Sequence, residues 1–206
     1  LSNFPLLSFA IWFPILSGIL LIFIDSKKNS FPGIYIKKIS LILASLSFVL
    51  TLLPVLFFNK FQVGFQFIEK FIWFKNLNVY YFLGVDGISI FFLPLTGLIT
   101  LIVICSAWEI IRTKVGLYMG NFLILSGLMI GVFCALDGLL FYIFFEATLL
   151  PMYLIIGIWG GPKKVYAAFK FFLYTLLGSL LALISIVYLY LTANSFSLQD
   201  WYVLPL

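Results

Sequence analysis

The chain has 206 residues, of which 64% are hydrophobic and 9% are charged, and its mean hydropathy is +1.22. Soluble domains carry about 25% charged residues, so this composition excludes a water-soluble globular protein and indicates an integral membrane protein. The net charge of +5 comes from lysines in short connections between apolar segments, which membrane topology explains, so we expect no nucleic-acid partner.

Six apolar segments are long enough to cross a bilayer, whose core of about 30 Å needs about 20 helical residues. They cover residues 5–24, 39–58, 87–107, 117–136, 138–159 and 167–191. The tail 194–206 is too short to span. The sequence therefore predicts an all-α membrane protein with about six transmembrane helices.

The connection 59–86 is the longest polar segment between the predicted helices. Polar and apolar residues alternate within it, as in Phe65-Gln66-Phe67-Ile68-Glu69. Alternation with a period of two is typical of a half-buried strand, so we expect a hairpin-like loop here.

Basic residues gather in the connections after the first, third and fifth predicted helices. These connections hold Lys27, Lys28, Lys37, Lys38, Arg112, Lys114, Lys163 and Lys164, whereas the opposite side holds Lys60, Lys70 and Lys75. The positive-inside rule places the first group in the cytoplasm or matrix and both termini on the other side.

Two aspartates stand directly before apolar segments, in Asp86-Gly87 and Asp137-Gly138. A carboxylate at this position accepts hydrogen bonds from free N–H groups of the first helical turn and interacts favourably with the helix dipole. We interpret both residues as helix N-caps.

Glu146 lies in the middle of the apolar segment 138–159. A carboxylate at this depth costs ~2.5–3.5 kcal/mol on insertion scales and usually marks a proton or ion pathway. Pro151 follows five residues later and leaves the carbonyl of Ala147 without its helical donor. We therefore predict that Glu146 relays protons. A protonated glutamate that donates a hydrogen bond within a helix interface is the alternative.

Lys170 lies near the start of the sixth predicted helix, one turn after Tyr166. Its long side chain can extend to the basic side of the membrane. The alternative is a place at the entrance of a proton pathway from that side.

The chain has two cysteines, Cys105 and Cys134, and no histidine. Both cysteines lie in or beside apolar segments without the spacing of metal ligands, so we interpret them as small buried apolar residues. We expect neither a metal nor another cofactor on this chain.

Three motifs, in order along the chain, resemble a known family. They are Gly84-Val85-Asp86-Gly87-Ile88-Ser89, then Phe145-Glu146-Ala147-Thr148-Leu149-Leu150-Pro151-Met152-Tyr153 with Gly157-Ile158-Trp159-Gly160-Gly161, and Val165-Tyr166-Ala167-Ala168-Phe169-Lys170-Phe171-Phe172-Leu173-Tyr174-Thr175. They are similar to the subunit 4 family of proton-pumping NADH:ubiquinone oxidoreductase (respiratory complex I), whose members are antiporter-like.

This resemblance implies a fourteen-helix subunit with two inverted repeats, each containing a half-channel. Residues 1–115 would hold helices one to three and the hairpin-like loop 59–86, and that loop would lie on the intermembrane side. Residues 116–206 would hold helices four to six and begin the first repeat. Glu146 falls on the family's fifth-helix glutamate, whose protonation is linked to a lysine on helix seven.

Family members are considerably longer than this chain, which stops after helix six. We therefore expect a companion chain that supplies helices seven to fourteen with a buried lysine, or else a subunit that has lost its pump half. The other implied partners are the remaining membrane-arm subunits and membrane lipids.

The expected location is the mitochondrial inner membrane, because eleven of the twelve basic residues are lysine and the chain starts with Leu, as A/T-rich organelle genomes favour. Three alternatives stay open. They are a scaffold that does not pump, a subunit of a multi-subunit cation/proton antiporter, and a plastid relative.

Overall fold

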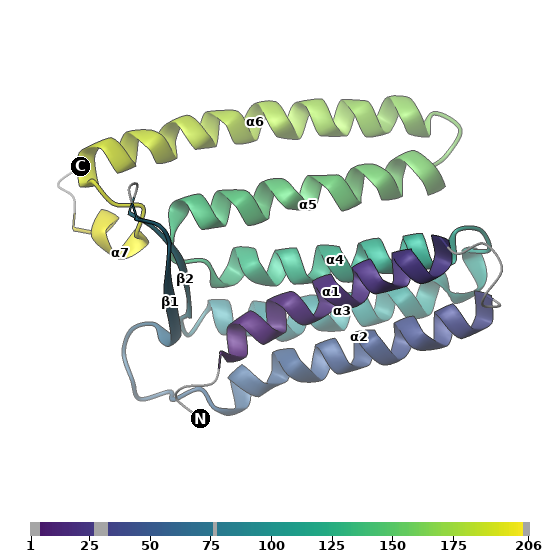
Figure 1. Cartoon of the computed structure of the whole chain (residues 1–206), viewed down its shortest axis with the longest axis horizontal. Helices are drawn as coiled ribbons and strands as arrows, with labels where there is room; N and C mark the ends of the chain where they lie inside the picture. Colours follow the sequence, from purple (N-terminus) through teal and green to yellow (C-terminus); the bar gives the residue numbers. More distant parts are fainter. Residues whose placement is uncertain (1–4, 27–32, 76–77, 204–206) are drawn as a thin grey trace.

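The computed structural model describes residues 5–26, 33–75 and 78–203. Figure 1 shows a bundle of long helices with a hairpin across one end. The elements are α1 (Leu6–Ser26), α2 (Gly33–Leu56), β1 (Gln66–Phe74), β2 (Val79–Val85), α3 (Ser89–Ile110), α4 (Val115–Cys134), α5 (Gly138–Trp159), α6 (Lys164–Ala193) and α7 (Leu198–Trp201).

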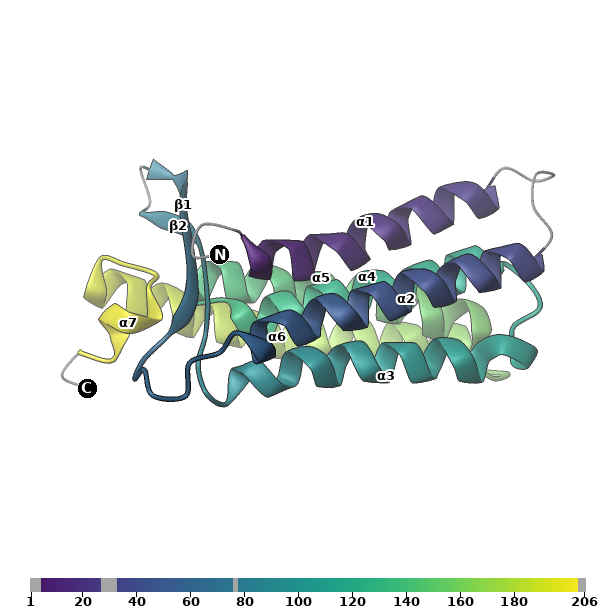
Figure 2. The ribbon, with the colours of Figure 1, turned by 90° about the horizontal axis from the view of Figure 1, so that it is seen from below.

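Within the described residues, six helices are long and apolar enough to cross a membrane, as the sequence predicted. They have 20–30 residues each and mean hydropathies of 1.9–2.4. They run side by side along the bundle (Figures 1 and 2). Helix α2 starts at Gly33, earlier than predicted, because its polar first turns continue the helix beyond the apolar segment.

Helices α1 and α4 are in backbone contact through glycines. A Cβ atom built on Gly120 would lie 2.6 Å from the carbonyl oxygen of Gly18, and one built on Gly127 would lie 2.5 Å from that of Ile11. Small residues allow such close approach between membrane helices, where packing rather than water exclusion drives association. The glycines of α4 thus determine how closely α1 can lie.

The core lies within α1 to α4, with side chains from the hairpin and α5 at one end. Leu83 and Val85 of β2 are fully buried against Ile90 and Leu93 of α3. By contrast, few side chains of α6 are buried, and they are Ala168, Ser179 and Ile186. Helix α6 packs on α5 and exposes most of its remaining surface.

Strands β1 and β2 form an antiparallel hairpin within the segment 59–86, with Phe71 opposite Tyr81. A further bridge joins Leu83 to Ala135, and Asp137 in turn pairs with Ser197. The hairpin, the α4–α5 connection and the segment before α7 therefore meet at one end of the bundle (Figure 1). The suggested division of the chain at residue 115 stays a prediction, and the α1–α4 contact crosses it.

Glu69 of β1 ties the hairpin to the start of α1. Its carboxylate accepts hydrogen bonds from the amides of Leu7 (2.8 Å) and Ser8 (3.2 Å) and from the Ser8 hydroxyl. These amides belong to the first turn of α1, where no helical acceptor exists. Burial removes water from the carboxylate and raises the pKa of Glu69, although the hydrogen bonds from Ser8 and Leu7 oppose that rise.

We predict that Gly120→Leu lowers the free energy of unfolding by about 1–3 kcal/mol or more, because the new side chain meets the backbone of α1, which cannot move aside. The measurement is thermal unfolding of the purified protein in detergent. Gly178→Leu on α6 is the matched control, since a Cβ there meets nothing within 4 Å. Equal melting temperatures for the two variants would contradict the α1–α4 contact.

We predict that Glu69→Gln removes a pH-dependent contribution to stability. The folded pKa is raised, so the contribution of Glu69 is fully present below its unfolded pKa and is lost as the pH rises through the folded pKa. The melting temperature of the unmodified protein should therefore fall, relative to that of the variant, as the pH rises through this range. Parallel pH profiles for the two proteins would count against a desolvated Glu69.

Candidate functional site

Most carboxylates of the chain lie at helix ends. Asp137 is fully buried, and its Oδ1 accepts hydrogen bonds from the amides of Leu139 (3.0 Å) and Leu140 (3.1 Å) at the start of α5. Its Oδ2 accepts from the amide of Tyr80 in β2 at 3.2 Å. Burial raises the pKa of Asp137 more than these hydrogen bonds lower it. The predicted N-cap is confirmed, and it also holds the hairpin.

Asp86 caps α3 in the same manner. Its Oδ1 accepts from the amides of Ser89 (2.6 Å) and Ile88 (3.1 Å), while the Ser89 hydroxyl accepts from the Asp86 amide at 3.0 Å. This reciprocal arrangement is a capping box. The hydrogen bond from the Ser89 amide is the main reason that the pKa of Asp86 is lowered. Asp86 thus pairs free amides at the start of α3 as predicted, but the N-cap position itself is occupied by Ile88.

Two further caps join elements that are distant in sequence, and the sequence did not reveal them. Glu69 caps α1 from the hairpin, and Asp25 at the end of α1 accepts from the amide of Leu117 in α4 at 3.2 Å. Gly116 permits that approach, because a Cβ atom there would lie 2.6 Å from the Cβ of Asp25. The apolar neighbours of Glu69 were the available signal that its carboxylate is buried.

Lysines serve the opposite helix ends. Lys37 donates to the carbonyl of Trp108 near the end of α3 at 2.5 Å, and Lys164 donates to that of Ile158 near the end of α5 at 2.6 Å. Cations are favourable at these carboxyl ends, where carbonyls lack helical donors. Lys27 and Lys28, which also entered the charge count, lie outside the described residues.

Glu146 differs from all these groups, because it lies in the middle of α5. The residue is partly buried, and its Oε2 atom is buried without a hydrogen-bond partner in the part of the chain that the structure describes. The hydroxyl of Thr148 is directed elsewhere, since it donates to the carbonyl of Phe145 at 2.7 Å. A buried polar atom without a hydrogen-bond partner costs free energy. Binding of a proton, a hydrogen-bond donor or water would therefore stabilise this carboxyl group.

Pro151 lies inside α5, which continues through it to Trp159. A proline has no amide hydrogen, so the carbonyl of Ala147 receives no bond from it. Ala147 adjoins Glu146 in the chain. A carboxyl oxygen without a partner and a carbonyl without its helical donor therefore occur on neighbouring residues.

Lys170 lies on the exposed surface of α6, and the structure does not pair it with Glu146. Its Nζ atom is 5.9 Å from the ring centroids of both Tyr166 and Tyr174, at the limit of a cation–π contact. Tyr153 of α5 contacts the rings of Phe169 and Phe172, each at 5.6 Å, which puts Lys170 level with Tyr153. Glu146 is seven residues before Tyr153, about 10 Å along the helix.

The cysteines differ in environment. Cys134 is buried as predicted, but Cys105 is exposed on α3, so the prediction for Cys105 was wrong. A membrane-facing surface accepts small apolar side chains as readily as a core does, and hydrophobicity therefore does not separate the two positions. Among the residues with described positions, no three His, Cys, Asp or Glu side chains cluster in a way that could hold a metal.

Sequence comparison relates the chain to subunits of NADH:quinone oxidoreductases. The family described as NADH:quinone oxidoreductase/Mrp antiporter, TM matches residues 135–203. NADH-quinone oxidoreductase subunit M of Rickettsia felis is 39% identical over 195 residues, which are 94% of this chain and 40% of that protein. NADH-ubiquinone oxidoreductase chain 4 of Chondrus crispus is 42% identical over 192 residues, which are 92% of this chain and 38% of that protein. The chain thus spans less than half the length of these relatives.

Structural comparison agrees. A chain of respiratory complex I from Thermus thermophilus matches with a TM-score of 0.81 and 28% identity, over 97% of this chain and 39% of that chain. A chain of the Mrp complex from a Dietzia species matches with a TM-score of 0.80 over 97% of this chain and 21% of that chain, and at 18% identity this likeness concerns the fold alone. Residues 135–203 therefore match the family described as NADH:quinone oxidoreductase/Mrp antiporter, TM, and nearly the whole chain is similar in sequence to the subunit M and chain 4 proteins and in fold to the complex I chain.

Proposed function

We propose that this chain is a membrane-arm subunit of NADH:ubiquinone oxidoreductase in the mitochondrial inner membrane and forms part of a proton-translocating half-channel. The relatives from Rickettsia felis and Chondrus crispus, which carry the names of such subunits, support this assignment. So does the 28% identical chain of the Thermus thermophilus complex.

The buried Oε2 atom of Glu146, which lacks a hydrogen-bond partner, is the observation that carries the proposal. Four of the seven carboxylates in the sequence, those of Asp25, Glu69, Asp86 and Asp137, cap helices and so have structural work. Glu146 has no such role, although its depth makes it expensive. In our proposal Glu146 binds a proton from one side and releases it when a positive charge approaches.

Among the described residues, no lysine is placed beside Glu146. Lys170, at a depth about 10 Å from that of Glu146, is too distant for a direct ion pair. We propose a companion chain that supplies helices seven to fourteen and a buried lysine opposite Glu146. The observation that supports it is that most of the surface of α6 is unpacked.

Lys170 has a separate role in this proposal, at the entrance of the pathway. It is exposed between two tyrosine rings in the half of α6 that adjoins the basic connections. A cation at that place would hold water near the entrance while Glu146 binds the proton deeper in the bundle. Simple extension of Lys170 to the membrane surface remains the competing explanation.

The proposed orientation puts the basic connections in the matrix, and both termini and the hairpin on the intermembrane side. The described residues Lys37, Lys38, Arg112, Lys114, Lys163 and Lys164 lie at helix ends away from the hairpin. The positive-inside rule assigns that end to the matrix. We further propose that quinone reduction takes place on other subunits and that this chain binds no redox cofactor.

Two other functions are compatible with the family. The first is a scaffold that anchors the membrane arm without pumping, and the exposed side of α6 would suit such an anchor. The second is a subunit of a cation/proton antiporter, which the description of the family that matches residues 135–203 favours, since it names the Mrp antiporter. The experiments below separate these functions from the proposed one.

We predict that Glu146→Gln lowers proton translocation coupled to NADH oxidation by roughly 100-fold or more, the scale of a lost proton-transfer group. Glutamine keeps the size and polarity of the side chain but cannot carry the proton. The measurement is acidification of vesicles that contain the intact complex, alongside its NADH oxidation rate.

Glu109→Gln is the matched control, because Glu109 is exposed near the end of α3 and should leave pumping unchanged. An assembled Glu146→Gln complex with normal pumping would support the scaffold and overturn the proton-relay role.

We predict that the chain, solubilised gently from native membranes, co-migrates with NADH-oxidising subunits and with a polypeptide that has a lysine within an apolar segment. Mass spectrometry of the native complex identifies these partners. Recovery with cation/proton antiporter subunits alone would favour the second alternative, and recovery as a homo-oligomer would exclude complex I.

A further inference from the structure

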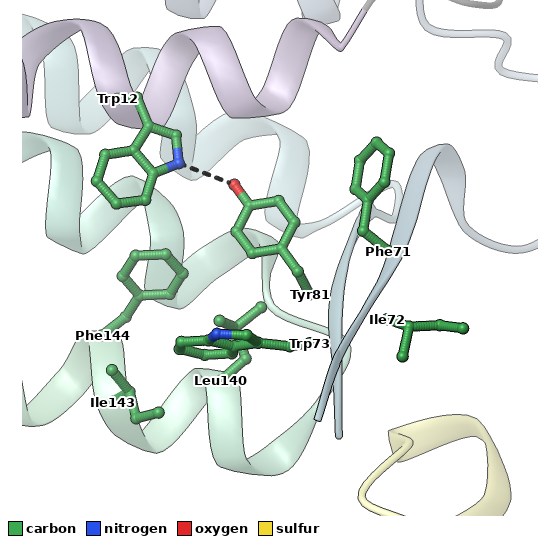
Figure 3. A pocket seen from close by; sticks show the side chains of 8 residues that line it. All are labelled: Trp12, Phe71, Ile72, Trp73, Tyr81, Leu140, Ile143 and Phe144. Atoms are coloured by element: carbon green, nitrogen blue, oxygen red, sulfur yellow. Dashed lines mark hydrogen bonds between the residues drawn. The ribbon is translucent and has the colours of Figure 1, made fainter. Parts of the chain in front are cut away.

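An apolar groove of about 420 Å³ lies between α1, α5 and the hairpin (Figure 3). Its size falls within the ~300–1,000 Å³ of typical small-molecule pockets. Besides two further side chains of β1, the groove is lined by Trp12, Trp73, Tyr81, Leu140, Ile143 and Phe144. Figure 3 shows Trp73 reaching from the hairpin towards Leu140, with Phe144 and Trp12 on the facing wall.

The groove lies where the membrane-spanning helices end. Trp12 belongs to the second turn of α1, and Leu140 to the first turn of α5. The hairpin crosses this same end of the bundle (Figure 1). Tryptophan and tyrosine concentrate at the boundary between headgroups and acyl chains because their rings are apolar with one polar atom. The groove therefore spans the depth at which a lipid changes from polar to apolar.

The polar atoms of one wall already have partners. The indole N–H of Trp12 donates to the hydroxyl of Tyr81 at 3.2 Å, and that hydroxyl is 3.1 Å from the hydroxyl of Ser8. Ser8 in turn donates to Glu69. This chain of hydrogen bonds leaves an occupant little on that wall to bind except the aromatic surface.

Trp73 supplies the remaining polar atom. Its side chain is 47% exposed, and its indole N–H has no hydrogen-bond partner among the residues that the structure places. An indole nitrogen is a donor and cannot accept. The groove thus combines an apolar interior with one free donor, which matches an occupant that is hydrocarbon with an acceptor at one end.

We propose that this groove binds one acyl chain of a membrane phospholipid, with the Trp73 indole N–H donating to the ester carbonyl of that chain. A transmembrane helix satisfies its own backbone hydrogen bonds and so offers the Trp73 donor no backbone acceptor, whereas the ester carbonyl of a lipid does. The lipid would pack α1, α5 and the hairpin together from outside. This inference does not depend on proton translocation.

The test uses the native complex in phosphatidylcholine vesicles that contain a lipid with a photoreactive diazirine in its acyl chain. After irradiation, peptide mass spectrometry locates the adducts. We expect several-fold more adduct on Trp12 and Phe144 than on Ile42 and Leu46, which are exposed on α2 by 66% and 47% but do not line this groove. Equal labelling of both regions would overturn the proposal.

Two substitutions separate the groove from the general lipid surface. Ile143→Trp fills the groove and should reduce labelling of Trp12 and Phe144 several-fold. Phe141→Trp is the control, because Phe141 is exposed to the same extent as Ile143, 39%, but does not line the groove. If both variants label like the unmodified protein, the occupant does not lie in the groove.

The Trp73 hydrogen bond is tested with ether-linked phosphatidylcholine, which lacks the ester carbonyl. The unmodified protein should prefer the ester-linked photoreactive lipid, and Trp73→Phe should abolish that preference. No preference in the unmodified protein would overturn the hydrogen bond. If lipid labelling is absent and a photoreactive residue at position 143 cross-links to another polypeptide, the groove is a protein interface and the lipid proposal is wrong.

Discussion

The need to satisfy helix ends in a medium with little water governs this structure. Unpaired N–H and C=O groups cost free energy near the hydrocarbon core, and most charged side chains of this chain lie at helix ends, where such groups occur. Carboxylates of Asp25, Glu69, Asp86 and Asp137 accept at amino ends, while Lys37 and Lys164 donate at carboxyl ends. Because several caps come from a different element, the same hydrogen bonds that complete one helix attach it to another.

Glu146 differs from these residues because, in the part of the chain that the structure describes, its carboxylate does not pair with a helix end. A charged residue in an ordinary soluble protein needs no explanation, but here the charges around it have visible structural partners. The buried oxygen of Glu146 has no hydrogen-bond partner among the described residues, and the carbonyl of Ala147 receives no hydrogen bond from Pro151. These two polar groups lie on neighbouring residues within an apolar helix.

Features with a local cause could be predicted from the sequence. Apolar length predicted the six spans, and Asp86 and Asp137 were recognised as caps because each precedes its own helix. The caps from Asp25 and Glu69 could not be recognised, since their partners are 92 and 62 residues away. The exposure of Cys105 and the groove beside Trp12 escaped for a similar reason, because hydrophobicity does not distinguish a neighbouring helix from lipid. Glu146 could be singled out from the sequence because a carboxylate within a membrane helix costs free energy. That its Oε2 atom lacks a hydrogen-bond partner within the described ranges could be seen only in the structure.

The attachment of Glu69 to α1 has a consequence for how the chain is made. Helix α1 is synthesised before the hairpin, but its first-turn amides at Leu7 and Ser8 can pair only after Glu69 has been made, 62 residues after Leu7. Its far end, through Asp25, is used only when Leu117 has emerged. During synthesis, the first-turn amides of α1 therefore cannot pair with Glu69 until the hairpin has been made. Translation order and the order of tertiary closure differ in this protein.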